Sequence, residues 1–232
     1  MTTTYCLIHG SGQGPEGWKL LALELGRRGH HVLTPALDVS RAADAGLAWH
    51  AGTLVEALER SERRPEEVVC VAHSASGMYL PLLAERWKPR GMIFLAALVP
   101  RPGVSVMEQF RSDPTMFNPA WVGKNPTDDA VALEYVFHDC PPERLGWAMS
   151  TRIIFYARTA LGEPCPLPRW PSVPAGYVVC ADDRTIAPAW QRRASRELLG
   201  VDAIEIPGGH CPHVSRPEAL ADALETIEGR IR

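Results

Sequence analysis

Three short stretches carry the side chains that nucleophilic catalysis needs, and the first centres on a serine. Residues 72–77 are Ala-His-Ser-Ala-Ser-Gly and follow an apolar run. Small residues two places before and after Ser74 suit a tight strand-to-helix turn that exposes its hydroxyl. The alternative is an ordinary turn in which Ser74 caps a helix. We predict Ser74 as the nucleophile and the N–H of Ala75 as an oxyanion donor. We expect Ser76, which occupies a small-residue place, to face away.

A second stretch offers an acid. Residues 178–188 are Val-Val-Cys-Ala-Asp-Asp-Arg-Thr-Ile-Ala-Pro, so two aspartates follow an apolar run. An acid just past the end of a strand can reach a histidine on a neighbouring loop. We favour Asp183 over Asp182, because the residues after Asp183 match the run that usually follows such an acid. The alternative, a cap for a helix that begins at Pro188, fits both aspartates poorly in register.

A third stretch offers a base. Residues 206–213 are Ile-Pro-Gly-Gly-His-Cys-Pro-His, and the two glycines free the backbone for a loop that turns His210 inward. We predict His210 as the general base. His213 is expected to be either a surface residue or a support behind that base. The two histidines do not predict a metal site, because we find no third ligand near them.

The order serine, acid, histidine along the chain differs from the order in other common serine triads. A fourth stretch supports this set: residues 9–14 are His-Gly-Ser-Gly-Gln-Gly and follow the first apolar run. Glycines there let the backbone approach a ligand. The N–H of Ser11 is therefore predicted as the second oxyanion donor, and Gly10 is predicted to border the substrate. The alternative for this stretch alone is a plain glycine-rich connection.

The elements that must position these residues alternate along the chain. Short apolar runs are typical of parallel strands covered on both faces, and amphipathic stretches with leucine and alanine at helical spacing lie between them. Such alternation predicts an α/β fold with right-handed crossovers. The expected strands are residues 4–9, 31–35, 68–72, 92–98, 177–181 and 203–206, and the expected helices are residues 18–28, 47–60, 78–87, 188–199 and 217–227.

Residues 101–174 interrupt this alternation and contain no convincing strand. Together with Pro100, the segment holds more than half of the chain's 21 prolines, and it is rich in aromatic residues. We predict a helical cap, inserted after the fourth strand, over the strand ends where open α/β sheets bind ligands. The alternative is a helical extension without a binding role. Phe117, Trp121 and Tyr135 are candidates for the substrate-facing wall, with simple packing inside the cap as their alternative.

The composition of the chain limits the kinds of partner that it is expected to bind. The chain has 232 residues, of which 46% are hydrophobic and 22% charged, with a net charge of −3. This fits one globular domain with an insertion. The net charge offers no excess of basic residues with which to bind nucleic acid. No apolar run approaches the roughly 20 residues that a helix needs to span a bilayer. The first residues lack the basic region and cleavage site of a secretory signal, so we expect a cytoplasmic protein in which the six cysteines form no disulfides.

The sequence resembles the α/β-hydrolase superfamily, in particular the small branch that includes plant methylesterases, hydroxynitrile lyases and bacterial esterases. The resemblance covers nearly the whole chain. It is carried by Leu-Ile-His-Gly at 7–10 with Trp18, by the serine stretch at 72–77, by Ala-Ala-Leu-Val-Pro at 96–100, and by the stretches around Asp183 and His210. It implies a six-stranded, mostly parallel sheet flanked by helices. The chain departs from the family pattern where Ala72 and Ser76 replace glycines, and both replacements are small.

The resemblance also implies a function. It is that of a serine hydrolase that cleaves a carboxylic ester, lactone or thioester of a small, largely apolar or aromatic substrate through an acyl-enzyme on Ser74. Such a reaction needs no cofactor and no metal. The implied partner is the small-molecule substrate, and the resemblance leaves open whether the protein forms a homodimer.

Three alternatives stay open beside this function. The first is a hydroxynitrile-lyase-like reaction, although that family has threonine in place of Gly10 and a cap lysine for the cyanide. Lys124, the one lysine in residues 101–174, lies in a polar turn. The second is an acyltransferase or cyclase in which an alcohol replaces water. The third is a small-molecule receptor that keeps the triad.

Overall fold

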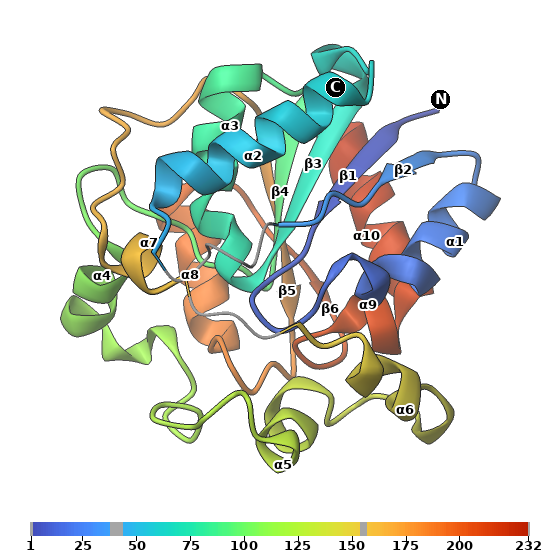
Figure 1. The fold of residues 1–232 in the computed structure, drawn as a ribbon, viewed down its shortest axis with the longest axis vertical. Helices are drawn as coiled ribbons and strands as arrows, with labels where there is room; N and C mark the ends of the chain where they lie inside the picture. The colour runs from blue at the N-terminus through green and yellow to red at the C-terminus, as the bar shows by residue number, and fades with distance from the viewer. Residues whose placement is uncertain (1, 38–43, 154–156, 232) are drawn as a thin grey trace.

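A six-stranded sheet forms the centre of the computed structural model, which describes residues 2–37, 44–153 and 157–231 (Figure 1). The strand order is β2-β1-β3-β4-β5-β6, and every neighbouring pair is parallel. All six expected strands are confirmed, with ends that differ by a few residues. Their bounds are β1 (Thr4–Ile8), β2 (His31–Leu33), β3 (Val68–His73), β4 (Gly91–Leu95), β5 (Ala175–Cys180) and β6 (Ile204–Ile206).

Helices bury both faces of this sheet, which explains why its strands are apolar without alternation. Along β1, Tyr5 and Leu7 pack on the side of α1 (Lys19–Arg27) and α10 (Pro217–Arg230). Cys6 and Ile8 pack on the opposite side, with α2 (Leu47–Arg60), α3 (Leu80–Trp87) and α8 (Pro188–Leu198). The remaining short elements of the core are the 3-10 helices η1 (Pro15–Trp18) and η2 (Pro65–Glu67), and α9 (Pro212–Ser215).

The helix ends follow local sequence signals. Pro188 and Pro217 each occupy the first turn of their helix, where the missing N–H of proline leaves no hydrogen bond unmade. The helix α2 spans the predicted residues 47–60. The helix α3 begins two residues later than predicted, at Leu80, because the 3-10 helix η3 (Ser74–Met78) precedes it.

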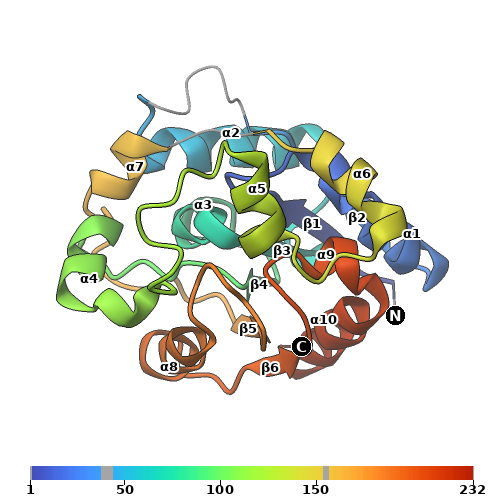
Figure 2. The same cartoon turned by 90° about the horizontal axis from the view of Figure 1, so that it is seen from below.

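Residues 101–174, here named the inserted segment, fall between β4 and β5 in the sequence, and their described helices lie on the side of the sheet where the strands end (Figure 2). Their described part contains helices and isolated bridges but no strand. Phe155 and Tyr156 lie outside the described residues. The helices are α4 (Val106–Ser112), η4 (Pro114–Met116), α5 (Asp129–Val131), the π-helix η5 (Ala132–Val136), α6 (Pro142–Ser150) and α7 (Arg158–Gly162).

All six cysteines are free thiols, as expected. Among the described residues, no helix has both the length and the apolar character needed to cross a membrane.

The tightest packing around the serine turn occurs at Gly77. A Cβ atom there would lie 2.0 Å from the backbone oxygen of Leu98, which cannot move aside cheaply. We expect Gly77→Ala to lower the free energy of unfolding by at least about 2 kcal/mol. Gly26→Ala is the matched control, because it lies in α1 with no atom within 4 Å of the added carbon, and it should gain up to about 1 kcal/mol. Urea denaturation measures both, and equal midpoints for the two variants would contradict the argument.

Candidate active site

Ser74 stands at the end of β3, where the chain turns into η3. Its φ of 57° is in the left-handed region, which a non-glycine residue rarely adopts. The turn is held because the N–H of Leu98 donates to the Ser74 carbonyl oxygen at 3.0 Å. This geometry matches the strained turn expected from the sequence, and it leaves Ser74 partly exposed while Ser76 is buried.

The structure brings Ser74, His210 and Asp183 together in one hydrogen-bonded chain. The distance from Ser74 Oγ to His210 Nε2 is 2.9 Å, and from His210 Nδ1 to Asp183 Oδ2 it is 2.8 Å. A carboxylate can only accept, so Nδ1 carries the proton and Nε2 presents its lone pair to the serine hydroxyl. Both the aspartate and the histidine are buried. The arrangement can remove the Ser74 proton and hold the resulting imidazolium.

The buried carboxylate of Asp183 has four further donors. Its Oδ1 accepts from the N–H and hydroxyl of Thr185, at 2.7 and 2.9 Å, and from the N–H of Ile186 at 3.2 Å. Its Oδ2 also accepts from Gln191 Nε2 at 2.8 Å. Gln191 is fully buried on α8 and was not predicted, because a lone glutamine on a helix has no distinguishing spacing. The competing Asp182 instead accepts from the N–H of Gly208 at 3.1 Å.

The loop after β1 lies directly against the serine. A Cβ atom on Gly10 would come within 2.8 Å of Ser74 Cβ, so glycine is needed for this approach. His9 Nε2 accepts from the N–H of Leu37 at 3.0 Å, which leaves the proton on Nδ1 to donate to the Gly10 carbonyl at 2.9 Å. The hydroxyl of Ser76 donates to the His9 carbonyl. Burial lowers the pKa of His9, which keeps the ring in this neutral form.

The predicted oxyanion donors Ser11 and Ala75 are both partly exposed. Ser11 directly follows Gly10, and Ala75 directly follows Ser74. Their backbones therefore lie in the two segments that the close approach of Gly10 to Ser74 brings together. Their role in holding an oxyanion stays a prediction.

The three aromatic residues predicted for the substrate wall pack mainly among neighbours. Trp121 contacts Tyr135, with ring centres 5.6 Å apart, and Lys124 Nζ lies 5.7 Å from the Tyr135 ring centre. Phe117 packs edge-on against Phe110, with ring centres 5.3 Å apart. Tyr135 is buried, whereas Phe117 and Trp121 are partly exposed. Contact of these residues with substrate stays a prediction.

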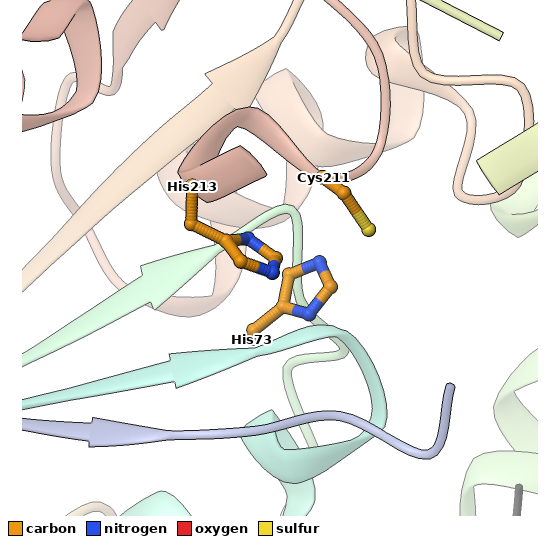
Figure 3. Close-up of side chains that lie close together, drawn as sticks. All are labelled: His73, Cys211 and His213. Carbon is orange, nitrogen blue, oxygen red and sulfur yellow. The ribbon is translucent and has the colours of Figure 1, made fainter. Parts of the chain in front are cut away.

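His213 is buried, so its expected place on the surface is wrong and its alternative place behind the base stands. Figure 3 shows it converging with His73 and Cys211, and one potential ligand atom from each lies within 4.8 Å of the others. Sequence reasoning missed this trio because it lacks a spaced motif.

Two nitrogens of the trio already take part in hydrogen bonds. His73 Nε2 lies 2.8 Å from the His210 carbonyl oxygen, and His213 Nε2 lies 2.7 Å from Gln13 Oε1. Both partners are acceptors, so both Nε2 atoms carry protons and offer no lone pair. Burial also raises the pKa of the Cys211 thiol well above its usual value, which disfavours the thiolate that metals bind.

The two buried histidines predict a pH dependence of stability. Burial lowers the pKa of His213 to about 3 and that of His73 well below its usual 6.5. Unfolded histidines bind protons below pH 6.5, so the stability from these groups is complete above pH 6.5 and falls as pH drops toward 3. We expect the free energy of unfolding to fall by about 2 kcal/mol per histidine from pH 7.5 to pH 5. Urea midpoints at the two pH values measure this, and unchanged midpoints would contradict it.

Comparison with curated proteins finds relatives along most of the chain. The pyrethroid hydrolase of Sphingobium wenxiniae is 27% identical over 246 residues, covering 96% of this chain and 86% of that protein. The salicylic acid-binding protein 2 of Nicotiana tabacum is 27% identical over 252 residues, covering 96% of each. These relatives support ester hydrolysis at the level of the family.

Solved structures show the same fold. A polyneuridine aldehyde esterase mutant superposes with a TM-score of 0.80 at 22% identity, covering 98% of this chain and 99% of that one. A pyrethroid hydrolase structure also has a TM-score of 0.80, at 23% identity, covering 99% and 98%.

A family model for alpha/beta hydrolases agrees with this fold. It matches residues 7–223, which include Ser74, Asp183 and His210. The chain therefore belongs to the alpha/beta hydrolase family.

Proposed function

We propose that this protein is a serine hydrolase that cleaves a carboxylic ester through an acyl-enzyme on Ser74. The observation that supports this proposal is the continuous hydrogen-bonded chain from Ser74 Oγ through His210 to the buried Asp183. A partly exposed serine at a left-handed turn, with a neutral imidazole nitrogen 2.9 Å from its oxygen, is prepared for attack on a carbonyl carbon.

In the first half of the reaction, Ser74 Oγ attacks the carbonyl carbon while its proton moves to His210 Nε2. Asp183 accepts from Nδ1–H throughout and stabilises the imidazolium. The substrate oxygen becomes an oxyanion, which the N–H groups of Ser11 and Ala75 hold. Loss of one such donor costs about 3 kcal/mol in comparable sites. The oxyanion then collapses, and the leaving alcohol takes the proton from His210.

In the second half, water enters and His210 removes its proton as the oxygen attacks the acyl carbon. Collapse of the second oxyanion breaks the bond to Ser74, which recovers its proton from His210. The same steps apply to a lactone or a thioester, and no cofactor takes part.

We propose a small, largely apolar or aromatic substrate. Two observations support this class: the aromatic side chains of the inserted segment, and the names of two relatives, which refer to pyrethroids and to salicylic acid. Transfer of the acyl group to an alcohol in place of water would use the same residues.

The crowding at Gly10 disfavours the hydroxynitrile-lyase alternative. Threonine at this position would place its Cβ within 2.8 Å of Ser74 Cβ and 3.1 Å of the His73 carbonyl oxygen. A change in the serine turn or in the loop after β1 would be needed to make room.

Pre-steady-state hydrolysis of p-nitrophenyl acetate and butyrate tests the proposed function. We expect wild-type protein to release one equivalent of p-nitrophenol in a burst, because with these activated esters acylation of Ser74 is faster than the water step that follows. Ser74→Ala should abolish the burst and lower turnover by at least about 10³-fold. Circular dichroism confirms that the variant is folded. Absence of burst and turnover in folded wild type, across a panel of aromatic esters and lactones, would overturn the hydrolase in favour of a receptor.

Crowding at Gly10 yields a second test. We expect Gly10→Ala to lower the rate of acylation by about 10- to 100-fold, because the added carbon must displace the Ser74 side chain or the loop that carries Ser11. Gly12→Ala is the matched control from the same loop, since no atom lies within 4 Å of its added carbon. Stopped-flow release of p-nitrophenol measures both variants. Equal acylation rates would show that the close approach has no bearing on the reaction.

A further inference from the structure

The side chain of Gln13 joins three segments that are far apart in sequence. It extends from the loop after β1 and is buried, with 3% of its surface exposed. Its Nε2 donates to Thr151 Oγ1 at 2.7 Å, at the end of α6 in the inserted segment. Its Oε1 accepts from His213 Nε2 at 2.7 Å, in α9 just after the predicted base. One amide thus connects the loop that carries Ser11 to the base loop and to the inserted segment.

The direction of every hydrogen bond in this chain is fixed. The hydroxyl of Thr151 donates to the Ala148 carbonyl at 2.9 Å, so its oxygen must accept from an N–H. Gln13 therefore turns its amide nitrogen to Thr151 and its oxygen to His213, and His213 carries its proton on Nε2. These hydrogen bonds permit one orientation of the Gln13 amide. If the amide were turned over, its oxygen would face the Thr151 oxygen and its NH₂ group would face the His213 N–H.

Backbone contacts hold the same loop against the inserted segment. The N–H of Gly14 donates to the Thr151 carbonyl at 3.0 Å. A Cβ atom on Gly14 would lie 2.4 Å from Ile153 Cδ1, and one on Gly17 would lie 3.0 Å from the Gln13 amide. The glycines permit this close packing, and Thr151 thus binds the loop through both its side chain and its backbone.

At its other end, this series of hydrogen bonds reaches the loop of the predicted base, His210. His213 packs against His73 (Figure 3), with ring centres 4.9 Å apart. His73 Nε2–H donates to the carbonyl of His210 at 2.8 Å. His73 immediately precedes Ser74. The ring of His213 also lies on Trp18, with centres 4.3 Å apart. A shift of Gln13 would therefore move the loop of Ser11 relative to both Ser74 and His210.

We propose that Gln13 is a positioning residue that, through Thr151 and His213, holds the oxyanion donor Ser11 at its working distance from Ser74. This proposal rests on the proposed function, and its specific content is that the inserted segment sets the geometry of the oxyanion loop. Such a role affects the stabilisation of the oxyanion more than the binding of the substrate, because it acts on the N–H that meets the charge of the transition state.

The test uses variants matched in size. Thr151→Val removes the acceptor of Gln13 and Thr151→Ser keeps it, and Gln13→Met keeps the length of the side chain without its polar atoms. Thr3→Val is a control at the opposite end of β1, where it also removes buried hydrogen bonds, to Glu228 and Arg90. Acylation is followed with p-nitrophenyl acetate. Inhibition by 2,2,2-trifluoroacetophenone, whose adduct with serine places an oxyanion in the same site, is the second readout.

We expect Thr151→Val and Gln13→Met to lower the acylation rate about 10-fold and to weaken inhibition in parallel, while the dissociation constant of the ester before acylation, from the dependence of the burst rate on ester concentration, changes less than twofold. Thr151→Ser and Thr3→Val should stay within twofold of wild type in both readouts. A folded Gln13→Met protein with wild-type acylation and inhibition would overturn the proposal while leaving the hydrolase intact. A folded wild type with neither burst nor turnover would overturn both. Stoichiometric binding of Zn²⁺ that is lost in Cys211→Ser, with unchanged rates in Thr151→Val, would replace the proposal by a metal site.

Discussion

The site depends on keeping the carboxylate of Asp183 charged while it is buried. An unpaired charge at such a place costs several kcal/mol, so every lone pair needs a donor. Thr185 and Ile186 supply three donors from the turn that follows Asp183, and Gln191 supplies another from α8. The last acceptor position is left to His210. The orientation of the imidazole, and with it the lone pair that faces Ser74, follows from how this carboxylate is satisfied.

The inserted segment contacts the loop that carries His210. Asp139 Oδ2 accepts from the N–H of Gly209 at 2.8 Å and from the hydroxyl of Ser215 at 2.9 Å, on the two sides of the base. Cβ atoms on Gly208 and Gly209 would lie 2.8 and 2.7 Å from the oxygens of the same carboxylate. The two glycines before His210 therefore serve a second purpose beside loop flexibility. They leave room for a carboxylate from another part of the chain.

Sequence patterns predicted the features that depend on chain order and on burial. Apolar runs located all six strands, and strand ends located Ser74, Asp183 and His210, because parallel strands present their carboxyl ends at one edge. They did not locate Gln13, Gln191, Thr151 or Asp139. Each of these is a single polar residue whose hydrogen-bond partner lies in another segment of the chain. No regular sequence spacing distinguishes such a residue from other polar residues. The place of His213 was ambiguous for the same reason, because its partner Gln13 lies 200 residues away in the sequence.

The departures from glycine around the serine show what the turn requires. Ala72 lies within β3, and Ser76 donates its hydroxyl to the carbonyl of His9. A glycine at 76 would lack that bond, so Ser76 holds the turn at Ser74 against the loop after β1. The positions that tolerate no side chain are instead Gly10, beside Ser74, and Gly77, beside the Leu98 carbonyl. A position needs a small residue where another backbone segment passes closest to it. Which position of the motif this is therefore depends on how the surrounding loops pack.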